Sequence, residues 1–214
     1  AEKWQSPVFV LSDQYLLDTV ATIPRDSFKL SSDVQSIVET TKSYERYALT
    51  ENGVSPRGVP GWGEGLVVVD SDEHTEDGHL TERLDTRVLM MNKRMKKLEG
   101  LIVDVLPPIR FGAEKAETVF VGWGSTHGAI VEALEKSGRT DAAYLHFKQV
   151  YPLPNNIDQW FEGVRNIFVV ENNYSGQFAS LLEKHGANIA GRIVKYNGEP
   201  FSVEELTEKI KNQE

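Results

Sequence analysis

Residues 118–128 read TVFVGWGSTHG, an apolar run followed by a glycine-rich turn. Residues 118–121 have the composition of a short buried strand, which ends at the first glycine. Ser125 or Thr126 can then cap a helix, and Gly138 marks the end of that helix. The stretch therefore predicts a strand that leads directly into a helix, the repeating unit of α/β proteins.

The same unit recurs along the rest of the chain. Further strands are expected at 142–147, 166–170 and 192–196, and further helices at 158–164, at 176–185 and from Ser202 onward. Ser202 followed by Glu205 forms a capping box, which fixes the start of the last helix. Strands that alternate with helices pair in parallel through right-handed crossovers. We therefore expect residues 117–214 to form a three-layer α/β domain around a parallel sheet.

Residues 1–106 lack this regular alternation. Residues 7–11 form an apolar run typical of a buried strand, residues 13–17 begin a short helix, and residues 65–70 suggest another strand. Residues 24–79 are an excursion punctuated by proline and glycine. A segment of this length without regular structure is more often a functional or interface element than a simple connecting loop.

A long helix and a linker follow the excursion. Apolar residues recur at spacings of three and four between 84 and 105, which predicts a helix packed on the core rather than a free coiled coil. Prolines and a glycine within 107–116 predict a linker to the domain at 117–214.

Composition excludes several classes of protein. The chain is 40% apolar and 26% charged, with 23 Lys and Arg against 32 Asp and Glu, a net charge of -9. Its apolar runs are far shorter than the roughly 20 residues that a bilayer demands. We therefore expect neither a membrane span nor a nucleic-acid partner. The chain starts at Ala1 without Met or a signal peptide, so we expect a piece of a longer protein.

Zero cysteines exclude disulfides, thiolate nucleophiles and cysteine-ligated clusters in this polypeptide. Residues 73–79 hold Glu, His and Asp side chains of the types that bind metals, but a solvated loop explains them better. No Ser/His/Asp or paired-carboxylate arrangement follows from the spacing. We therefore predict no metal site and no catalytic residue in this chain.

The turns after the strands are the places where a ligand could bind, because ligands collect at the carboxyl ends of parallel strands. Glycines at 122, 124 and 128 are reminiscent of a phosphate cradle. A dinucleotide fingerprint needs the third glycine one place earlier and an acidic residue at the end of the second strand, where His146, Phe147 and Lys148 stand. Nicotinamide binding is therefore disfavoured.

Five side chains at these turns are candidate cofactor-binding residues: Ser125, Thr126, His127, Asn172 and Asn173. His127 lies in the first turn of its helix, where the dipole favours a neutral imidazole that could donate to a ligand. A solvated or capping histidine is the alternative. Asn172 and Asn173 can grip polar ligand atoms, or their amides can simply stabilise the turn.

Six short blocks of the sequence occur in an order that resembles one known family. They are PVFVLSDQYL at 7–16, SPRGVPG at 55–61, GHLTE at 78–82, VGWGS at 121–125, HFKQVYPLP at 146–154 and VENNYSGQ at 170–177. The same order is seen in the alpha subunit of 2-oxoacid:ferredoxin oxidoreductases. The resemblance is to its carboxy-terminal part. It implies that residues 1–106 end a pyrimidine-binding thiamin diphosphate domain and that residues 117–214 resemble the transketolase carboxy-terminal domain.

The resemblance implies an enzyme that oxidatively decarboxylates a 2-oxoacid with coenzyme A and passes electrons to ferredoxin. Thiamin diphosphate with Mg would be shared with a beta subunit, which would also hold an iron-sulfur cluster. The family's Tyr-Pro-Ile-Thr-Pro-Ser motif is missing here. Most of the thiamin site is therefore expected outside this chain, and the isolated chain is expected to be inactive.

The resemblance also implies site residues and partners. Ser55 and Arg57 become candidate cleft or coenzyme A contacts, with an interface loop that binds no ligand as the alternative.

The excursion at 24–79, with Val54, Val59 and Trp62, becomes the main contact with the beta subunit or a second copy, unless it folds back on helix 84–105. We expect a cytoplasmic oligomer. The competing interpretation is a stand-alone nucleotide- or anion-binding α/β module.

Overall fold

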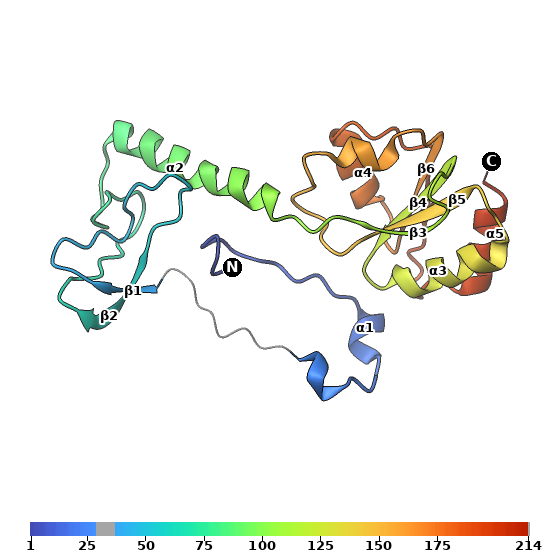
Figure 1. Ribbon diagram of the computed structural model, residues 1–214, viewed down its shortest axis with the longest axis horizontal. Coiled ribbons are helices and arrows are strands. Elements are labelled where there is room, and N and C mark those ends of the chain that lie inside the picture. The colour runs from blue at the N-terminus through green and yellow to red at the C-terminus, as the bar shows by residue number, and fades with distance from the viewer. Residues whose placement is uncertain (29–36, 214) are drawn as a thin grey trace. The chain divides into compact units, whose positions relative to one another are not determined.

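The computed structural model describes residues 1–28 and 37–213, and the chain divides into two compact units (Figure 1). The amino-terminal unit comprises Ala1–Val10 and Ala21–Asp104, and the carboxy-terminal unit comprises Leu11–Val20 and Val105–Glu214. Helix α1 (Gln14–Asp18), expected from residues 13–17, therefore belongs to the carboxy-terminal unit. Residues 29–36 of the predicted excursion lie outside the described residues.

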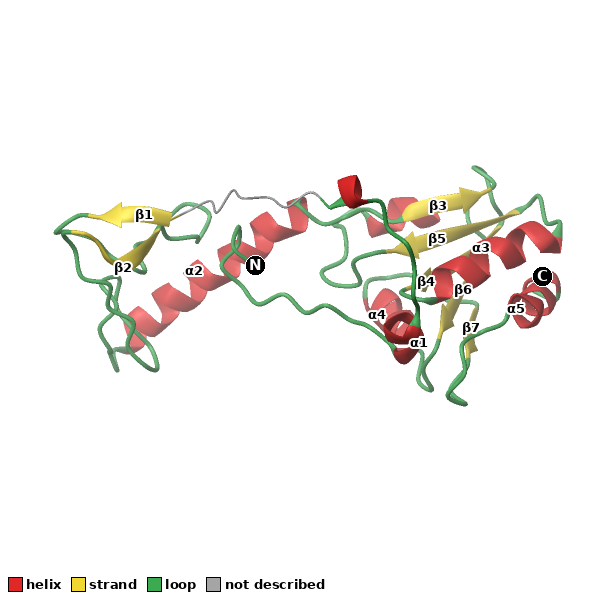
Figure 2. Cartoon of the chain, turned by 90° about the horizontal axis from the view of Figure 1, so that it is seen from below, coloured by secondary structure: helices red, strands yellow, loops and turns green. Residues whose placement is uncertain are grey.

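The carboxy-terminal unit is built on a five-stranded sheet of order β3-β5-β4-β6-β7 (Figure 2). Its strands are β3 (Ile109–Gly112), β4 (Thr118–Trp123), β5 (Ala142–Phe147), β6 (Asn166–Glu171) and β7 (Gly191–Val194). The last four pair in parallel, as predicted, and β3 pairs antiparallel with β5. The chain runs from β4 to β5 on one side and returns to β6 on the other, so the strand order reverses between β4 and β6.

Helices cover both faces of this sheet. On one face, α3 (Thr126–Ser137) and α5 (Val203–Lys211) contribute to a core with Phe120 of β4. On the other face, α4 (Gln177–Lys184) and the 3-10 helix η2 (Ile157–Phe161) pack with Val119. Successive residues of β4 thus point to opposite cores, which explains why the strand is apolar throughout. The predicted three-layer α/β fold is confirmed for this unit.

The glycine at the end of the 118–121 run lets α3 approach the sheet closely. A Cβ at Gly122 would lie 2.8 Å from Ile130 Cδ1 and 3.1 Å from Thr126 Oγ1. The helix therefore starts directly above the end of β4 because only glycine leaves room for it. Gly138 ends α3 in the left-handed conformation with φ of 70°, as the sequence predicts.

The amino-terminal unit has far less regular structure. It contains η1 (Arg25–Ser27), the parallel pair β1 (Ile37–Thr40) and β2 (Arg57–Gly63), and helix α2 (Leu84–Val103). Buried Thr40 ties the end of β2 and the loop after it to β1, because its hydroxyl lies 2.9 Å from the Trp62 carbonyl and 3.0 Å from that of Gly65.

Two strand predictions in the first half are wrong. Neither 7–11 nor 65–70 forms a strand, and Phe9 and Leu66 are 85% and 82% exposed. An apolar run becomes a strand only where a neighbouring strand accepts its backbone hydrogen bonds, and no described strand lies beside either run. Apolar composition alone was therefore an insufficient signal.

Three further predictions need correction. The helix at 84–105 is confirmed as α2, but its stripe is not packed on a core: Leu84 is 82% exposed, and only Met90 and Lys93 on this helix are buried. The expected linker at 107–116 contains β3, because these residues pair antiparallel with β5 and place Phe111 against the core of the sheet. Residues 158–164 form no α-helix, and the short η2 takes their place.

Candidate functional site

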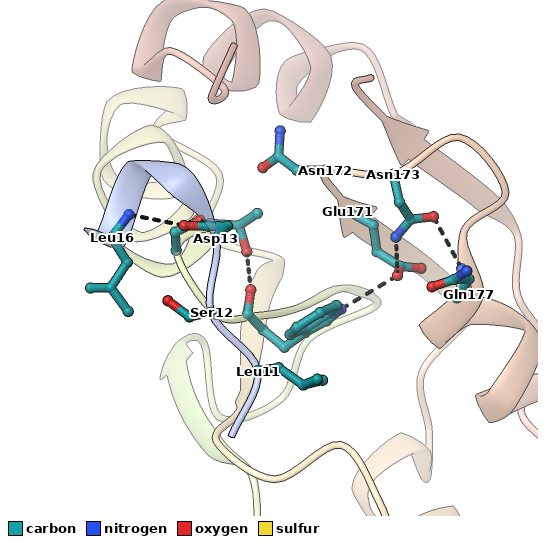
Figure 3. A pocket seen from close by; sticks show the side chains of 12 residues that line it. Leu11, Ser12, Asp13, Leu16, Glu171, Asn172, Asn173 and Gln177 are labelled. Carbon is teal, nitrogen blue, oxygen red and sulfur yellow. Dashed lines mark hydrogen bonds between the residues drawn. The ribbon is translucent and has the colours of Figure 1, made fainter. Parts of the chain in front are cut away.

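A pocket of about 240 Å³ lies at the carboxyl edge of β4 and β6, within the carboxy-terminal unit (Figure 3). This edge is where the strand order reverses, the usual ligand position in open α/β sheets. The pocket is lined by Leu11, Ser12, Asp13, Leu16, Trp123, Gly124, Ser125, Thr126, Glu171, Asn172, Asn173 and Gln177.

Glu171 is the most enclosed polar side chain of the pocket, at 1% exposure. Its carboxylate accepts hydrogen bonds from the backbone N–H groups of Phe178 and Ala179 at 2.9 and 3.0 Å. It also accepts from Asn173 Nδ2 at 2.8 Å and from Trp123 Nε1 at 3.4 Å (Figure 3). These four donors satisfy the buried charge, so Glu171 anchors the start of α4 to the end of β6.

The residues before α1 form another wall of the pocket. The carboxylate of Asp13 caps α1 by accepting from the Leu16 N–H at 2.9 Å, and its second oxygen accepts from the Ser125 hydroxyl (Figure 3). Sequence reasoning missed Asp13 as a pocket residue. Its capping role has a local signal, but its partner lies 112 positions further along the chain.

The charge of the pocket is negative. Two carboxylates, Asp13 and Glu171, line it, and its described lining residues include no Lys or Arg. Like charges repel, so the turn at Gly124 and Ser125 is poorly suited to hold a phosphate even though it precedes a helix. The pocket suits a neutral or cationic group with hydrogen-bond donors.

Four of the predicted ligand residues meet at this pocket: Ser125, Thr126, Asn172 and Asn173. Each also has a structural contact. Thr126 donates to the Trp123 carbonyl at 2.8 Å, and Asn173 Oδ1 accepts from the Gly176 N–H at 2.7 Å. Asn173 therefore stabilises its own turn, as the structural alternative predicts, while its side chain still borders the pocket.

His127 does not line the pocket and instead pairs with a second histidine. The rings of His127 and His146 are centred 4.2 Å apart, and Tyr144 Oη lies 2.9 Å from His146 Nδ1. Burial lowers the pKa of His127, with a smaller effect of Lys148. Burial, followed by the charges of His127 and Lys148, lowers the pKa of His146 to about 4. Both rings are therefore neutral near pH 7.

Ser55 and Arg57 belong to the amino-terminal unit. Ser55 is buried, and its hydroxyl donates to the Ala48 carbonyl at 2.8 Å and accepts from Lys93 Nζ at 2.5 Å. Arg57 is half-exposed and forms an ion pair with Glu2 at 2.8 Å. Of the two, only Arg57 has its charged group partly exposed, where a ligand could displace its partner Glu2.

The loop at 73–79 is more ordered than a solvated loop. Glu73 forms ion pairs with Arg87 at 2.9 Å and Arg94 at 2.7 Å, and the hydrogen bonds of these two arginines hold its pKa at about 2. His74 stacks on Tyr47 with ring centres 3.5 Å apart. Within residues 1–28 and 37–213, no three His, Cys, Asp or Glu side chains are grouped to hold a metal ion. No helix in these ranges is long and apolar enough to span a bilayer.

Comparison with known proteins identifies relatives along almost the whole chain. No protein-family model matches it. It is 34% identical to subunit alpha of 2-oxoacid:ferredoxin oxidoreductase 1 from Sulfurisphaera tokodaii, covering 98% of this chain and 34% of the relative. It is also 34% identical to subunit alpha of 2-oxoacid:ferredoxin oxidoreductase 2 from Aeropyrum pernix, covering 99% of this chain and 34% of that protein.

A solved structure supports the same relationship. The 2-oxoglutarate:ferredoxin oxidoreductase from Magnetococcus marinus, with 2-oxoglutarate, coenzyme A and succinyl-CoA bound, matches 79% of this chain and 30% of its own chain. The TM-score is 0.73 and the sequence identity 25%. The fold is therefore that of part of this α/β oxidoreductase chain. More particularly, the resemblance to alpha subunits of 2-oxoacid:ferredoxin oxidoreductases is confirmed, and the chain spans about a third of the length of the curated relatives it matches.

Proposed function

We propose that this chain is part of the alpha subunit of a 2-oxoacid:ferredoxin oxidoreductase. The observation that carries the proposal is the 34% identity to named alpha subunits over 98% of the chain. The complete enzyme would oxidatively decarboxylate a 2-oxoacid, join the acyl group to coenzyme A and reduce ferredoxin. We further propose a cytoplasmic oligomer that includes a beta subunit, as the family resemblance implies.

The residues of this chain do not fit two of the cofactors. An iron-sulfur cluster needs cysteines, and the sequence has none. Among the described residues no group of three ligands could hold the metal of thiamin diphosphate. We therefore assign the cluster to the beta subunit and the thiamin diphosphate with Mg mostly to segments outside this chain. When bound, thiamin stabilises the carbanion left by decarboxylation.

For coenzyme A, we propose Arg57 as a contact and retain Ser55 only as a support for its loop. The guanidinium of Arg57 is half-exposed and pairs with the exposed side chain of Glu2, so an anionic group could compete for it. The hydroxyl of Ser55 is enclosed and already has two partners. The relative from Magnetococcus marinus has coenzyme A bound, which supports the same ligand here.

The competing function is a stand-alone nucleotide- or anion-binding module. It has little support from the pocket at the carboxyl edge of β4 and β6. That pocket presents the carboxylates of Asp13 and Glu171 and no cationic lining residue among those described. A nucleotide phosphate would therefore meet repulsion at the turn that the glycine pattern favours.

The test is co-expression of the chain, completed at its amino end, with its beta partner. Pyruvate- or 2-oxoglutarate-dependent reduction of a viologen dye, stimulated by coenzyme A, is the expected result. The 214-residue chain alone should give no reduction, because it lacks cluster ligands. Dye reduction by the lone chain, or an inactive complete complex with its cofactors loaded, would refute the proposal.

A further inference from the structure

Three cationic side chains of the amino-terminal unit converge without a carboxylate partner. Arg46, Lys93 and Lys97 form no ion pair with any Asp or Glu in the part of the chain that the structure describes. A neighbouring cation on the same helix behaves differently. Arg94 is held by the carboxylate of Glu73 at 2.7 Å. On α2, the cation Arg94 thus has a carboxylate partner, whereas the described contacts of Lys93 and Lys97 are with uncharged oxygen atoms.

The cluster is held by neutral oxygen atoms. Both terminal nitrogens of Arg46 lie 3.3 Å from Gln5 Oε1, and Lys97 Nζ donates to the Gln5 carbonyl at 3.1 Å. Lys93 Nζ donates to the Ser55 hydroxyl at 2.5 Å. Gln5 thus serves two cations at once. Its φ of 43° lies in the left-handed region, which non-glycine residues adopt infrequently.

These contacts leave the charge uncompensated. Lys93 is only 8% exposed, and burial, followed by repulsion from Lys97 and Arg46, lowers its pKa to about 8. Burial and then repulsion from Arg46 also lower the pKa of Lys97. The negative charge of Glu76 raises the pKa of Lys93, but this effect is smaller than the effects that lower it. The Glu76 carboxylate accepts a hydrogen bond from the Leu49 N–H at 3.0 Å.

An aromatic ring keeps two of the cations in place. The Arg46 guanidinium lies 5.0 Å from the centre of the Tyr47 ring, and Lys93 Nζ lies 5.8 Å from it. Cation–π contacts at these distances orient a positive group without neutralising it. His74 stacks on the Tyr47 ring with ring centres 3.5 Å apart, which limits the movement of that ring. The cations are therefore held in place by uncharged oxygen atoms of Gln5 and Ser55.

We propose that Arg46, Lys93 and Lys97 form a binding site for a phosphate-type oxyanion, and that Gln5 occupies it as a neutral substitute. A multivalent anion matches three converging cations better than a single carboxylate does. The forked guanidinium of Arg46 and the two point charges of the lysines suit tetrahedral phosphate oxygens. The site excludes Arg57 and does not depend on the proposed oxidoreductase function.

Gln5 can leave the site while its segment remains attached. Trp4 Nε1 donates to the Asp104 carboxylate at 2.7 Å, and Lys3 pairs with the same carboxylate at 2.5 Å. These contacts hold the start of the chain on the end of α2. For the anion to enter, the side chain of Gln5, whose Nε2 donates to the Ser55 carbonyl at 2.6 Å, has to move away from Arg46. Lys97 and Lys93 then exchange their bonds to the Gln5 carbonyl and the Ser55 hydroxyl for bonds to the anion.

The test is isothermal titration of the full 214-residue chain with inorganic pyrophosphate and, separately, with ADP, at constant ionic strength set by chloride. Pyrophosphate is expected to bind the wild-type chain. The double variant Arg46→Gln/Lys97→Gln should lose about tenfold or more in affinity per charge removed. Lys96→Gln, an exposed neighbour on the same helix, is the matched control and should bind as the wild type does.

A variant that keeps all three cations separates binding from folding. Gln5→Glu puts a carboxylate oxygen in place of Oε1 beside Arg46, while the backbone carbonyl of residue 5 still accepts from Lys97. It should therefore abolish pyrophosphate binding while the chain still unfolds in a cooperative thermal transition. Gln5→Ala should bind pyrophosphate at least as tightly as the wild type. ADP binding tighter than pyrophosphate would identify a nucleotide-type ligand, and equal affinities a free oxyanion. Absence of binding to the wild type, or unchanged binding in Gln5→Glu and in the double variant, would overturn the proposal.

Discussion

Replacing Glu171 with Gln should destabilise the carboxy-terminal unit strongly. The buried carboxylate accepts from the N–H groups of Phe178 and Ala179 at 2.9 and 3.0 Å and from Asn173 at 2.8 Å. A Gln side chain has the same shape but turns one of the two acceptor oxygens into a donor. At least one buried donor then faces another donor and loses its partner.

The magnitude follows from these contacts. A hydrogen bond to a charged acceptor contributes about 1.5–3 kcal/mol, and a buried donor left unpaired costs about 1–3 kcal/mol. Loss of the charge and of one acceptor at Glu171 therefore should cost about 3 kcal/mol. The exposed carboxylate of Glu183 on the same helix, paired with Arg192 at 2.6 Å, is a control. Its replacement by Gln should cost about 1 kcal/mol or less, as for other surface ion pairs.

The assay must report on the carboxy-terminal unit alone, because the two units need not unfold together. Hydrogen exchange measured by mass spectrometry on peptides that cover α4 meets this requirement. Glu171→Gln should speed exchange of the amides of Phe178 and Ala179. It should also lower the denaturant concentration at which the peptides that cover α4 become half exchanged. If Glu171→Gln is as stable as Glu183→Gln, the hydrogen bonds to the Glu171 carboxylate do not anchor α4.

Two other predictions concern the histidine pair and the exposed tryptophan. The pKa values of His127 and His146 are lowered below 6.5 in the folded state, that of His146 to about 4. The unfolded chain therefore binds more protons between about pH 4 and 6.5, so stability should fall by on the order of 2 kcal/mol as the pH drops through this window. Urea unfolding measured at each pH should show that the free energy of unfolding decreases less with falling pH in His146→Gln than in the wild type. Trp62 is 47% exposed, so Trp62→Ala should change the stability of the lone chain by about 0.5 kcal/mol or less. It should weaken association with the beta partner by about 2 kcal/mol or more, and undiminished co-purification with a less stable lone chain would instead indicate internal packing.

The parallel sheet could be predicted because its signals are local. Each of β4, β5 and β6 is apolar on both faces, and a capping residue or glycine stands near the boundaries of the helices that follow. Strand β3 could not be predicted, because its own local signals indicate a connection. It is short, follows Pro108 and ends at Gly112, residues that usually mark a connection, and only its pairing with β5 makes it a strand.

The site could be predicted only in part. Ser125 and Asn173 follow neighbouring strands, so the topology brings them to one edge of the sheet. Asp13 joins them through a contact across 112 positions, and Lys93 reaches Ser55 across 38. No pattern of composition or spacing encodes contacts at such separations without knowledge of the fold. The cationic cluster around Gln5 escaped sequence reasoning for the same reason.

The errors in the first half share one physical cause. Burial of an apolar residue depends on what surrounds it, whereas a sequence pattern reports only that the residue is apolar. Phe9, Leu66 and Leu84 have the patterns of buried residues and are all more than 80% exposed. If the chain is part of a longer alpha subunit, as proposed, the rest of that subunit or its partner would supply the missing neighbours. The patterns would then describe the assembled enzyme correctly, and the same residues would become protected from hydrogen exchange on assembly.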